Sequence, residues 1–275
     1  MEKQGIRCAL AHLVILGLLA LYMLPIAWML STSLKPDSEL FTEQIRWVPN
    51  RVAWENYQHA LATFPFGLYL RNTLLIAGLS VVGALLSSLP PAYAFARMRW
   101  RGRTFWFWVM LSTLMLPPQV TLLPVFLLFR TLGWVDTFLP LIVPAFLGNA
   151  FLIFMLRQFF LTLPQELIDA ARLDGCSEWR ILWQLVVPLA KPAVATVALF
   201  SFVWAWTDFM NPLIYLNDAS KFTLAVGLQY FLGRHGEQWN LLMAAATVVT
   251  APLVLLFLLT QRAYVRGITL TGLKG

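Results

Sequence analysis

Long apolar stretches alternate with short polar stretches along the whole chain. Each apolar stretch is close to the ~20 residues that a helix needs to cross the ~30 Å hydrocarbon core of a bilayer. These stretches lack the period-two alternation of a membrane β-barrel. We therefore predict an all-α, polytopic membrane protein with one membrane domain over residues 1–275. The six predicted transmembrane helices cover residues 8–30, 74–96, 105–129, 138–156, 193–216 and 241–260.

The composition agrees with a membrane protein. Of the 275 residues, 59% are hydrophobic and 12% are charged, whereas water-soluble domains carry about 25% charged residues. The first apolar stretch follows Lys3 and Arg7 and is longer than the core of a signal peptide, so we interpret it as a membrane anchor. The cysteines and histidines are scattered singly without metal-ligand spacing, and we predict no metal site.

The basic residues predict the orientation. With the N-terminus in the cytoplasm, most of the 20 Lys and Arg residues fall on the cytoplasmic side, including the cluster at Arg97, Arg99, Arg101 and Arg103. Both termini and the polar residues 163–192 are then cytoplasmic. Because the net charge of +7 is explained by this topology, we predict no nucleic-acid partner.

The chain encodes no energy source of its own. A phosphate-cradling loop of the GxxxxGK[ST] type needs a lysine after a glycine, and no lysine here follows one. An ion-gradient carrier usually has ionisable residues within its spans, and here we find little beyond His12 and Asp208. We also see no cluster of catalytic groups. We therefore predict that the chain is not an enzyme and that, if it moves a solute uphill, a partner supplies the energy. The alternative is a secondary carrier of small solutes.

Residues 163–192 form a polar, helix-forming interval between two apolar stretches. Thr162 and Gln165 have the spacing of a capping box at the start of a first helix. Along that helix, Glu166, Asp169 and Arg172 share one face, with each acid N-terminal to the base. This pattern predicts a cytoplasmic helix after the fourth span.

A glycine elbow then joins this helix to a second one. Gly175 supplies a left-handed stop after Asp174, and Ser177 caps a second helix over residues 178–187. We interpret the pair as a knob that meets a partner. The alternative is an amphipathic helix resting on lipid headgroups, because Trp179 and Trp183 share one face.

The same residues carry a resemblance to a known family. The pattern consists of Asp169-Ala170-Ala171, Gly175, Leu185 and Val187-Pro188. It resembles the EAA loop of ATP-binding-cassette importer permeases, in which this helix enters a groove of the ATPase subunit. The family usually has Glu, Ile and Leu where this chain has Asp169, Leu185 and Val187, and these differences keep the charge or the apolar character.

Further motifs along the chain resemble one branch of that family, the smaller permease subunit of maltose- and glycerol-3-phosphate-type carbohydrate importers. They are Ser33-Leu34-Lys35, Glu55-Asn56-Tyr57, Asn72-Thr73, Ala92-Tyr93-Ala94-Phe95-Ala96-Arg97, Pro124, Arg157-Gln158-Phe159-Phe160, Gln261-Arg262 and residues 267–275. One departure lies in the fifth span, where the family often has Trp-Asn-Asp/Glu-Phe. This chain has Trp206-Thr207-Asp208-Phe209, so a polar role of the second position in the pore is in doubt.

The resemblance implies a heteromer in the cytoplasmic (inner) membrane. Its other members would be a homologous permease, two ATPase subunits that bind ATP and Mg, and an extracytoplasmic solute-binding protein. This chain itself would bind no cofactor. The residues implied to couple to the ATPase are Glu166, Asp169, Ala170, Ala171, Gly175, Leu185 and Pro188, and those of the C-terminal ATPase contact are Gly272, Lys274 and Gly275.

The substrate pathway is the least determined site in the sequence. Asn149 either faces a polar pathway or bonds to a neighbouring helix. Sugar sites use stacked aromatic rings, which makes Tyr93, Trp204 and Trp206 candidates, together with Asp208. We expect the chain to form half of the pathway for a sugar or a related polyol or phosphate.

Overall fold

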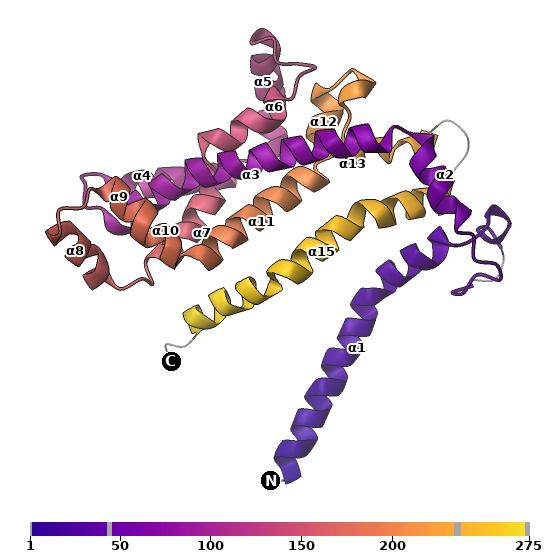
Figure 1. The fold of residues 1–275 in the computed structure, drawn as a ribbon, viewed down its shortest axis with the longest axis horizontal. Coiled ribbons are helices and arrows are strands. Elements are labelled where there is room, and N and C mark those ends of the chain that lie inside the picture. Colours follow the sequence, from indigo (N-terminus) through magenta and orange to yellow (C-terminus); the bar gives the residue numbers. More distant parts are fainter. Residues whose placement is uncertain (1, 43–45, 234–237, 273–275) are drawn as a thin grey trace. The chain divides into compact units, whose positions relative to one another are not determined.

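The computed structural model describes residues 2–42, 46–233 and 238–272, and within these ranges the regular structure is entirely helical. The chain divides into two compact units, Met1–Phe66 with Gly227–Pro252 and Gly67–Val226 with Leu253–Gly275. Figure 1 shows the helices with their labels.

The first unit is held together by two buried asparagines. Asn56 donates from Nδ2 to the carbonyls of Ser33 (2.9 Å) and Lys35 (2.8 Å). Asn240, which is 2% exposed, donates to Asp37 Oδ1 at 2.7 Å. These bonds connect the end of the first helix to two later helices. The helices of this unit are α1 (Glu2–Ser33), a 3-10 turn (Asp37–Glu39), α2 (Glu55–Thr63), α14 (Tyr230–Gly233) and the first part of α15 (Trp239–Gly272).

The second unit contains the long helix α3 and the helices that follow it. They are α3 (Phe66–Arg97), α4 (Arg103–Ser112), α5 (Pro118–Thr131), α6 (Leu139–Ile142), α7 (Ala150–Phe160), α8 (Gln165–Leu173), α9 (Glu178–Ile181), α10 (Val187–Leu189), α11 (Lys191–Thr207), α12 (Met210–Tyr215) and α13 (Leu224–Gly227). Short 3-10 helices cover Thr113–Met115, Val143–Leu147 and Ala219–Lys221, and a π-helical turn covers Leu182–Val186.

Several helices have the length and composition to cross a membrane. Four apolar stretches pass this test singly, and two bent helix pairs bring the number to as many as six among the described residues. The four are Leu10–Ser33, Phe66–Arg97, Leu139–Phe160 and Trp239–Gln261. The bent pairs are Arg103–Met115 with Pro118–Thr131 (96°) and Glu178–Leu189 with Lys191–Thr207 (85°).

Three of the predicted spans are not single helices. The one over residues 105–129 breaks at Pro117 and Pro118, because a proline disfavours helical backbone at the residue before it. Accordingly, Leu116 and Pro117 are extended, with ψ of 117° and 134°. Within residues 138–156, the chain is interrupted at Gly148 (φ +91°) and resumes as α7.

The span predicted over residues 193–216 is interrupted after Thr207, where α11 ends. In a continuous helix, the ring of Pro212 would clash with the carbonyl of residue 208, four positions earlier. The chain instead turns at Asp208 and continues as α12. Asp208 Oδ1 accepts from the backbone N–H of Asn211 (3.2 Å), within the first turn of α12.

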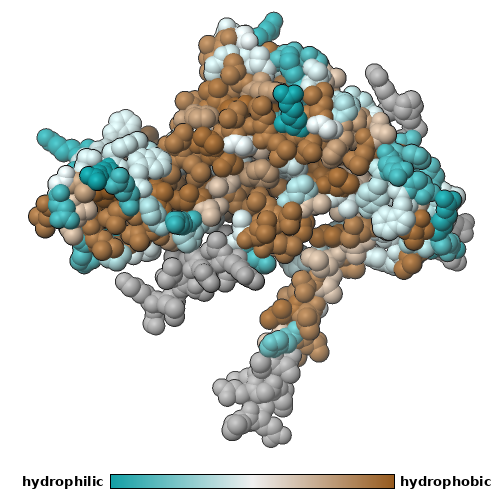
Figure 2. Space-filling model, in the orientation of Figure 1, coloured by the Kyte–Doolittle hydropathy of each residue, from teal (hydrophilic) through white to brown (hydrophobic). Residues whose placement is uncertain are grey.

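The core of the second unit lies where α3, α7, α8, α9 and α11 meet. Its fully buried side chains include Leu156, Phe160, Ile168, Val186 and Val197. Figure 2 shows hydrophobic side chains along the long helices and hydrophilic ones around α8 and α9. The core therefore extends from the apolar helices into the polar segment between α7 and α11.

Candidate functional site

The polar segment between α7 and α11 has the predicted elbow. Helix α8 ends in a Schellman motif, in which Cys176 N–H donates to Ala171 O (3.0 Å) and Gly175 N–H to Arg172 O (3.0 Å). Gly175 has φ +77°, and no atom lies within 4 Å of where a Cβ would stand. Ser177 Oγ then accepts from Arg180 N–H (3.3 Å), so Ser177 caps α9 as predicted.

Two details of this segment differ from the sequence prediction. The predicted capping box is wrong, because the N-cap of α8 is Pro164. Thr162 lies two residues before that N-cap, and its Oγ1 donates instead to Phe159 O (2.8 Å). The second helix also runs further than residue 187, to Leu189. It does so through the π-helical turn, in which Val187 N–H donates to Leu182 O.

The two faces of α8 differ in burial. Ile168 is 1% exposed and belongs to the core of the unit, and Ala171 packs against that core. On the other face, Ala170 is exposed and Leu173 is 89% exposed. The helix is thus anchored to its own chain on one side and open on the other.

The exposed residues of this segment also include Glu166, Asp169 and Gly175. Leu185 is partly buried against the core, and Pro188 is exposed. The predicted coupling residues therefore lie on one short segment, and most of them are accessible to a partner.

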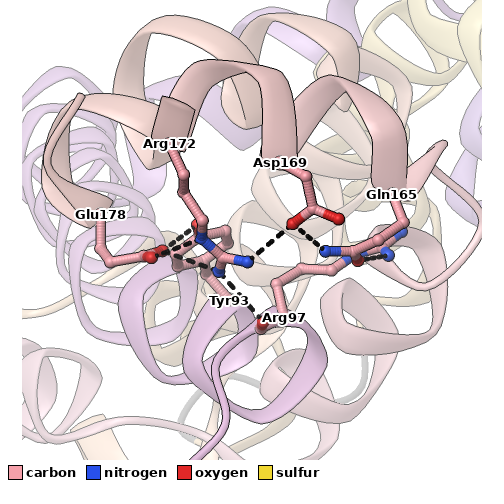
Figure 3. Close-up of polar contacts among 6 residues, drawn as sticks. All are labelled: Tyr93, Arg97, Gln165, Asp169, Arg172 and Glu178. Carbon is pink, nitrogen blue, oxygen red and sulfur yellow. Dashed lines mark hydrogen bonds and ion pairs between the residues drawn. The ribbon is translucent and has the colours of Figure 1, made fainter. Parts of the chain in front are cut away.

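A polar network fastens this segment to the end of α3 (Figure 3). The Tyr93 hydroxyl donates to Glu178 Oε2, and Arg172 Nε donates to Glu178 Oε1 at 2.7 Å. Arg172 also donates to Asp169 Oδ1 (3.0 Å) and, from Nη2, to the carbonyl of Arg97 (3.3 Å). The network joins α8 and α9 to each other and to α3.

Arg97 completes the network from the last turn of α3. Its guanidinium donates to the carbonyl of Phe160 from Nε (2.9 Å), to the carbonyl of Leu163, and to Gln165 Oε1 (2.7 Å). The Phe160 carbonyl belongs to the last turn of α7, where carbonyls lack intrahelical partners. One side chain therefore connects the ends of α3 and α7 to the start of α8.

The charges in the network stabilise one another. The hydrogen bond with Glu178 raises the pKa of Arg172, and the hydrogen bond from Arg172 lowers the pKa of the Glu178 carboxyl. Both side chains are about one-third exposed (33% and 36%). Solvent screening makes each ion pair worth little alone, so positioning rather than stability is the main consequence of the network.

A second candidate site lies at the two helix breaks of the second unit. A cavity of about 250 Å³ is bordered by α3, the stretch before α7, the start of α7 and the end of α11. Its polar lining side chains are Ser80, Asn149, Ser201, Trp204 and Asp208. A larger, open hollow of about 410 Å³ lies along the arginine-rich turn between α3 and α4.

The backbone geometry places these side chains at the cavity. Gly148 turns the chain with φ +91°, and Asn149 Oδ1 then caps α7 by accepting from the N–H groups of Phe151 (3.0 Å) and Leu152 (3.1 Å). Trp204 is 44% exposed, and its ring lies 5.9 Å from the ring of Phe151.

The comparisons with known proteins decide the family. The family described as the binding-protein-dependent transport system inner membrane component matches residues 80–270. The chain belongs to this family. It is therefore a permease subunit of an ATP-binding-cassette importer and a multi-pass membrane protein.

Individual relatives match nearly the whole length of this permease. The permease is 34% identical over 276 residues to the sn-glycerol-3-phosphate transport system permease protein UgpE of Yersinia pestis bv. Antiqua, and the match covers 97% of each chain. It is also 34% identical to the arabinooligosaccharides transport system permease protein AraQ of Halalkalibacterium halodurans, covering 91% of each. A chain of a bacterial ABC transporter that imports the acidic polysaccharide alginate superposes with a TM-score of 0.81 at 26% identity, covering 92% of the permease and 95% of that chain.

The structure separates the residues that we predicted for the pathway. Asn149, Trp204 and Asp208 line one cavity. Tyr93 belongs instead to the network with Glu178, and Trp206 is 2% exposed and stacks on Phe202 at 5.3 Å. Gly272 ends α15, whereas Lys274 and Gly275 lie outside the described residues.

Sequence reasoning missed several residues of both sites. In the cavity these are Ser80 and Ser201, whose signal is a small polar residue within an apolar span. In the network, the sequence marked Arg97 as a topology signal and as part of a family motif, but it predicted no contact of Arg97 with α7 or α8 and did not identify Glu178 as a partner of Tyr93. Tyr93 and Glu178 are 85 positions apart in the sequence, so no local spacing relates them.

Proposed function

We propose that this permease forms half of the translocation pathway for a sugar or a related polyol or phosphate, and that separate ATPase subunits drive it through residues 163–192. The relatives named above are transport proteins for sn-glycerol-3-phosphate and arabinooligosaccharides. Their names support a polyhydroxylated solute. The chemistry of the cavity, with small polar side chains beside an indole ring, agrees with such a solute.

The observation that carries the coupling role is the contrast between the two faces of α8. The inner face is fixed to the unit by Ile168 and by the bonds of Arg172 and Arg97, so a force on α8 reaches α3 without bending the segment. The outer face presents Ala170, whose small side chain lets another surface approach the backbone closely. An ATPase that closes on ATP would move this segment as a rigid lever.

Membership of the family supports the rest of the assembly. Two ATPase subunits would hold ATP and Mg, a second homologous permease would complete the pathway, and an extracytoplasmic binding protein would deliver the solute. The permease would cross the inner membrane six times, with both termini in the cytoplasm. The α7–α11 segment and the arginine-rich turn after α3 would then lie on the same, cytoplasmic side.

The coupling role can be tested with a bulky charge on the outer face of α8. Ala170→Arg should leave the fold intact, because Ala170 is exposed, but it should abolish co-purification of the ATPase subunits and ATP-dependent uptake in proteoliposomes. Ala219→Arg is the matched control, since Ala219 is exposed in the loop between α12 and α13. If Ala170→Arg retained normal ATPase binding and uptake, the coupling assignment would be wrong.

A further inference from the structure

The turn between α3 and α4 concentrates positive charge. Arg97, Arg99, Arg101 and Arg103 lie within residues 97–103, and residues 56–135 contain no Asp or Glu. Arg97 is held in the network with α7 and α8. Arg99 and Arg101 are exposed, and neither has an ion pair among the described residues. In the part of the chain that the structure describes, these two cations therefore have no anionic partner.

Part of this charge lies in the open hollow of about 410 Å³ along the turn. The residues that line the hollow are Arg99, Trp100, Gly102, Arg103, Thr104 and Phe105. Its volume is within the range of about 300–1,000 Å³ that is usual for small-molecule sites. Arg101 belongs to the same turn but does not line the hollow. A cytoplasmic orientation requires basic residues in the loop, but it does not require them to line a concave surface.

A second cation lies close to Arg103. The charge of Arg103 acts on Arg157 of α7, and the two guanidinium groups repel each other. Both are held by neutral acceptors: Arg103 Nη1 donates to Met98 O (3.0 Å), and Arg157 Nε donates to Phe95 O (3.3 Å). The guanidinium of Arg157 also lies 4.1 Å from the centre of the Phe107 ring. An anion bound in the hollow would offset this repulsion.

The first turn of α4 adds hydrogen-bond donors to the same hollow. Gly102 is the N-cap, with φ +84°, and it supplies no side chain to cap the helix. The N–H groups of Thr104 and Phe105 have no acceptor among the described residues. Free N–H groups at a helix N-terminus favour phosphate and other anions. The hollow therefore combines guanidinium and backbone N–H donors, which together suit a phosphate group.

The surface next to the hollow indicates where the phosphate comes from. The side chains of Phe105, Trp106 and Trp108 are 64%, 55% and 64% exposed, and they continue from the turn along α4. This helix belongs to a bent pair with the length and composition to cross a membrane. Tryptophans at such a position lie at the level of the lipid headgroups. Basic pockets of membrane proteins at the cytoplasmic face bind anionic headgroups.

We propose that the hollow binds the phosphate headgroup of an anionic phospholipid, of the phosphatidylglycerol type, in the cytoplasmic leaflet. Arg99 and Arg103 contact the phosphate, while Trp100 and Phe105 pack against the glycerol and the upper acyl chain. A zwitterionic headgroup is disfavoured, because it would bring a further cation next to the arginines. The proposal rests on the proposed function only for the side of the membrane, and it adds a lipid partner.

The lipid can be identified by photo-crosslinking in the assembled importer. With p-benzoylphenylalanine in place of Phe105, a photoreactive ring lines the hollow. The same replacement of Trp108 is the control, because Trp108 is equally exposed on α4 but does not line the hollow. The importer is reconstituted in nanodiscs with equal amounts of dioleoyl-phosphatidylglycerol and dioleoyl-phosphatidylcholine. Mass spectrometry should find about fivefold more phosphatidylglycerol than phosphatidylcholine adduct at position 105, and equal amounts at position 108.

Two arginines of the same turn provide a matched variant and control. Arg99→Gln removes one cation from the lining and should lower the enrichment at position 105 about fivefold. Arg101→Gln removes the same charge outside the lining, where solvent screens it, and should change the enrichment less than about twofold. Both arginines are exposed, so we expect both variants to fold. Arg99→Lys should retain most of the enrichment, because it keeps the charge.

Three results would overturn the lipid site. Equal enrichment at positions 105 and 108, or equal losses in Arg99→Gln and Arg101→Gln, would show only a diffuse basic surface. Suppression of the adducts by excess inorganic phosphate would show that a soluble anion is the ligand. Release of the ATPase subunits by Arg99→Gln, with the enrichment unchanged, would show a protein contact instead. The adducts are measured without uptake and with the same lipids in both leaflets, so failure of the proposed function would leave the result intact.

Discussion

The hydroxyl of Tyr93 donates a hydrogen bond to the carboxylate of Glu178, which connects the last turns of α3 to the first residue of α9. Arg172 holds the other oxygen of the same carboxylate at 2.7 Å. The acid is therefore fixed from both sides, by a transmembrane helix and by the exposed helix α8. The bond is a direct polar link between α3 and residues 163–192, beside the bond from Arg172 to the Arg97 carbonyl.

We predict that Tyr93→Phe uncouples transport from ATP hydrolysis without unfolding the protein. The change removes one hydrogen bond to a partly exposed carboxylate, so its cost in stability should be about 1 kcal/mol. Solute transported per ATP hydrolysed in proteoliposomes should fall several-fold. Tyr22→Phe is the control, because Tyr22 is 74% exposed on α1. An unchanged transport ratio in Tyr93→Phe would show that the bond carries no coupling.

The glycine elbow between α8 and α9 was predictable because the residues that form it are next to each other in the sequence. Gly175 and Ser177 lie within three residues of the helix ends that they terminate, and their backbone chemistry depends little on the rest of the fold. The length of each apolar stretch likewise predicted where apolar helices would lie. These features need only the residues next to them.

Other features depend on parts of the chain that are distant in sequence. The apolar length of residues 193–216 suggested one helix, although Pro212 already contained the local reason for its interruption at Asp208. Tyr93 looked like a sugar platform because its aromatic ring was the only property visible in the sequence. Its role in the network depends on the packing of α3 against α9. That packing joins residues that are distant in sequence, so no spacing within the sequence predicts it.

Gly175 provides a second prediction. Its φ of +77° is unfavourable for residues with a Cβ, and the surrounding space is open, so the penalty comes from the backbone alone. Gly175→Val should cost about 1–2 kcal/mol and reduce ATP-dependent uptake. Gly175→Asn should retain more uptake, because asparagine tolerates the left-handed region. Equal uptake by the valine and asparagine variants would show that the elbow geometry does not matter for coupling.

Gly83 provides a packing prediction near the cavity. A Cβ at this position would lie 2.5 Å from Phe146 Cδ2, so the whole ring would have to move. Gly83→Ala should therefore destabilise the protein by about 1–3 kcal/mol, measured as a lower Tm in detergent. Gly78→Ala on the same helix is the control, since no atom lies within 4 Å of its Cβ position. A Tm of Gly83→Ala at or above that of Gly78→Ala would contradict the observed packing.

The last prediction concerns the loop between α5 and α6. Asp136 accepts hydrogen bonds from the N–H groups of Asn217 and Asp218 (3.0 Å each) and pairs with Lys221 at 2.7 Å. The Lys221 bond and the two backbone bonds lower the pKa of Asp136 from 3.8 to about 2. The carboxylate thus holds the 217–221 loop against this turn.

The sign of the pH effect follows from the lowered pKa of Asp136. Its stabilisation of the loop is fully present above the unfolded pKa of 3.8 and is lost as the pH falls through about 2. Hydrogen exchange of residues 217–221, corrected for intrinsic rates, should be unchanged from neutral pH to pH ~4 and should accelerate below that. Asp136→Asn should exchange fast at every pH, because asparagine keeps the left-handed backbone (φ +61°) but loses the charge. Asp174→Asn, an exposed acid on the coupling segment, should behave as the wild type, and loss of protection already at pH ~5 would contradict the lowered pKa.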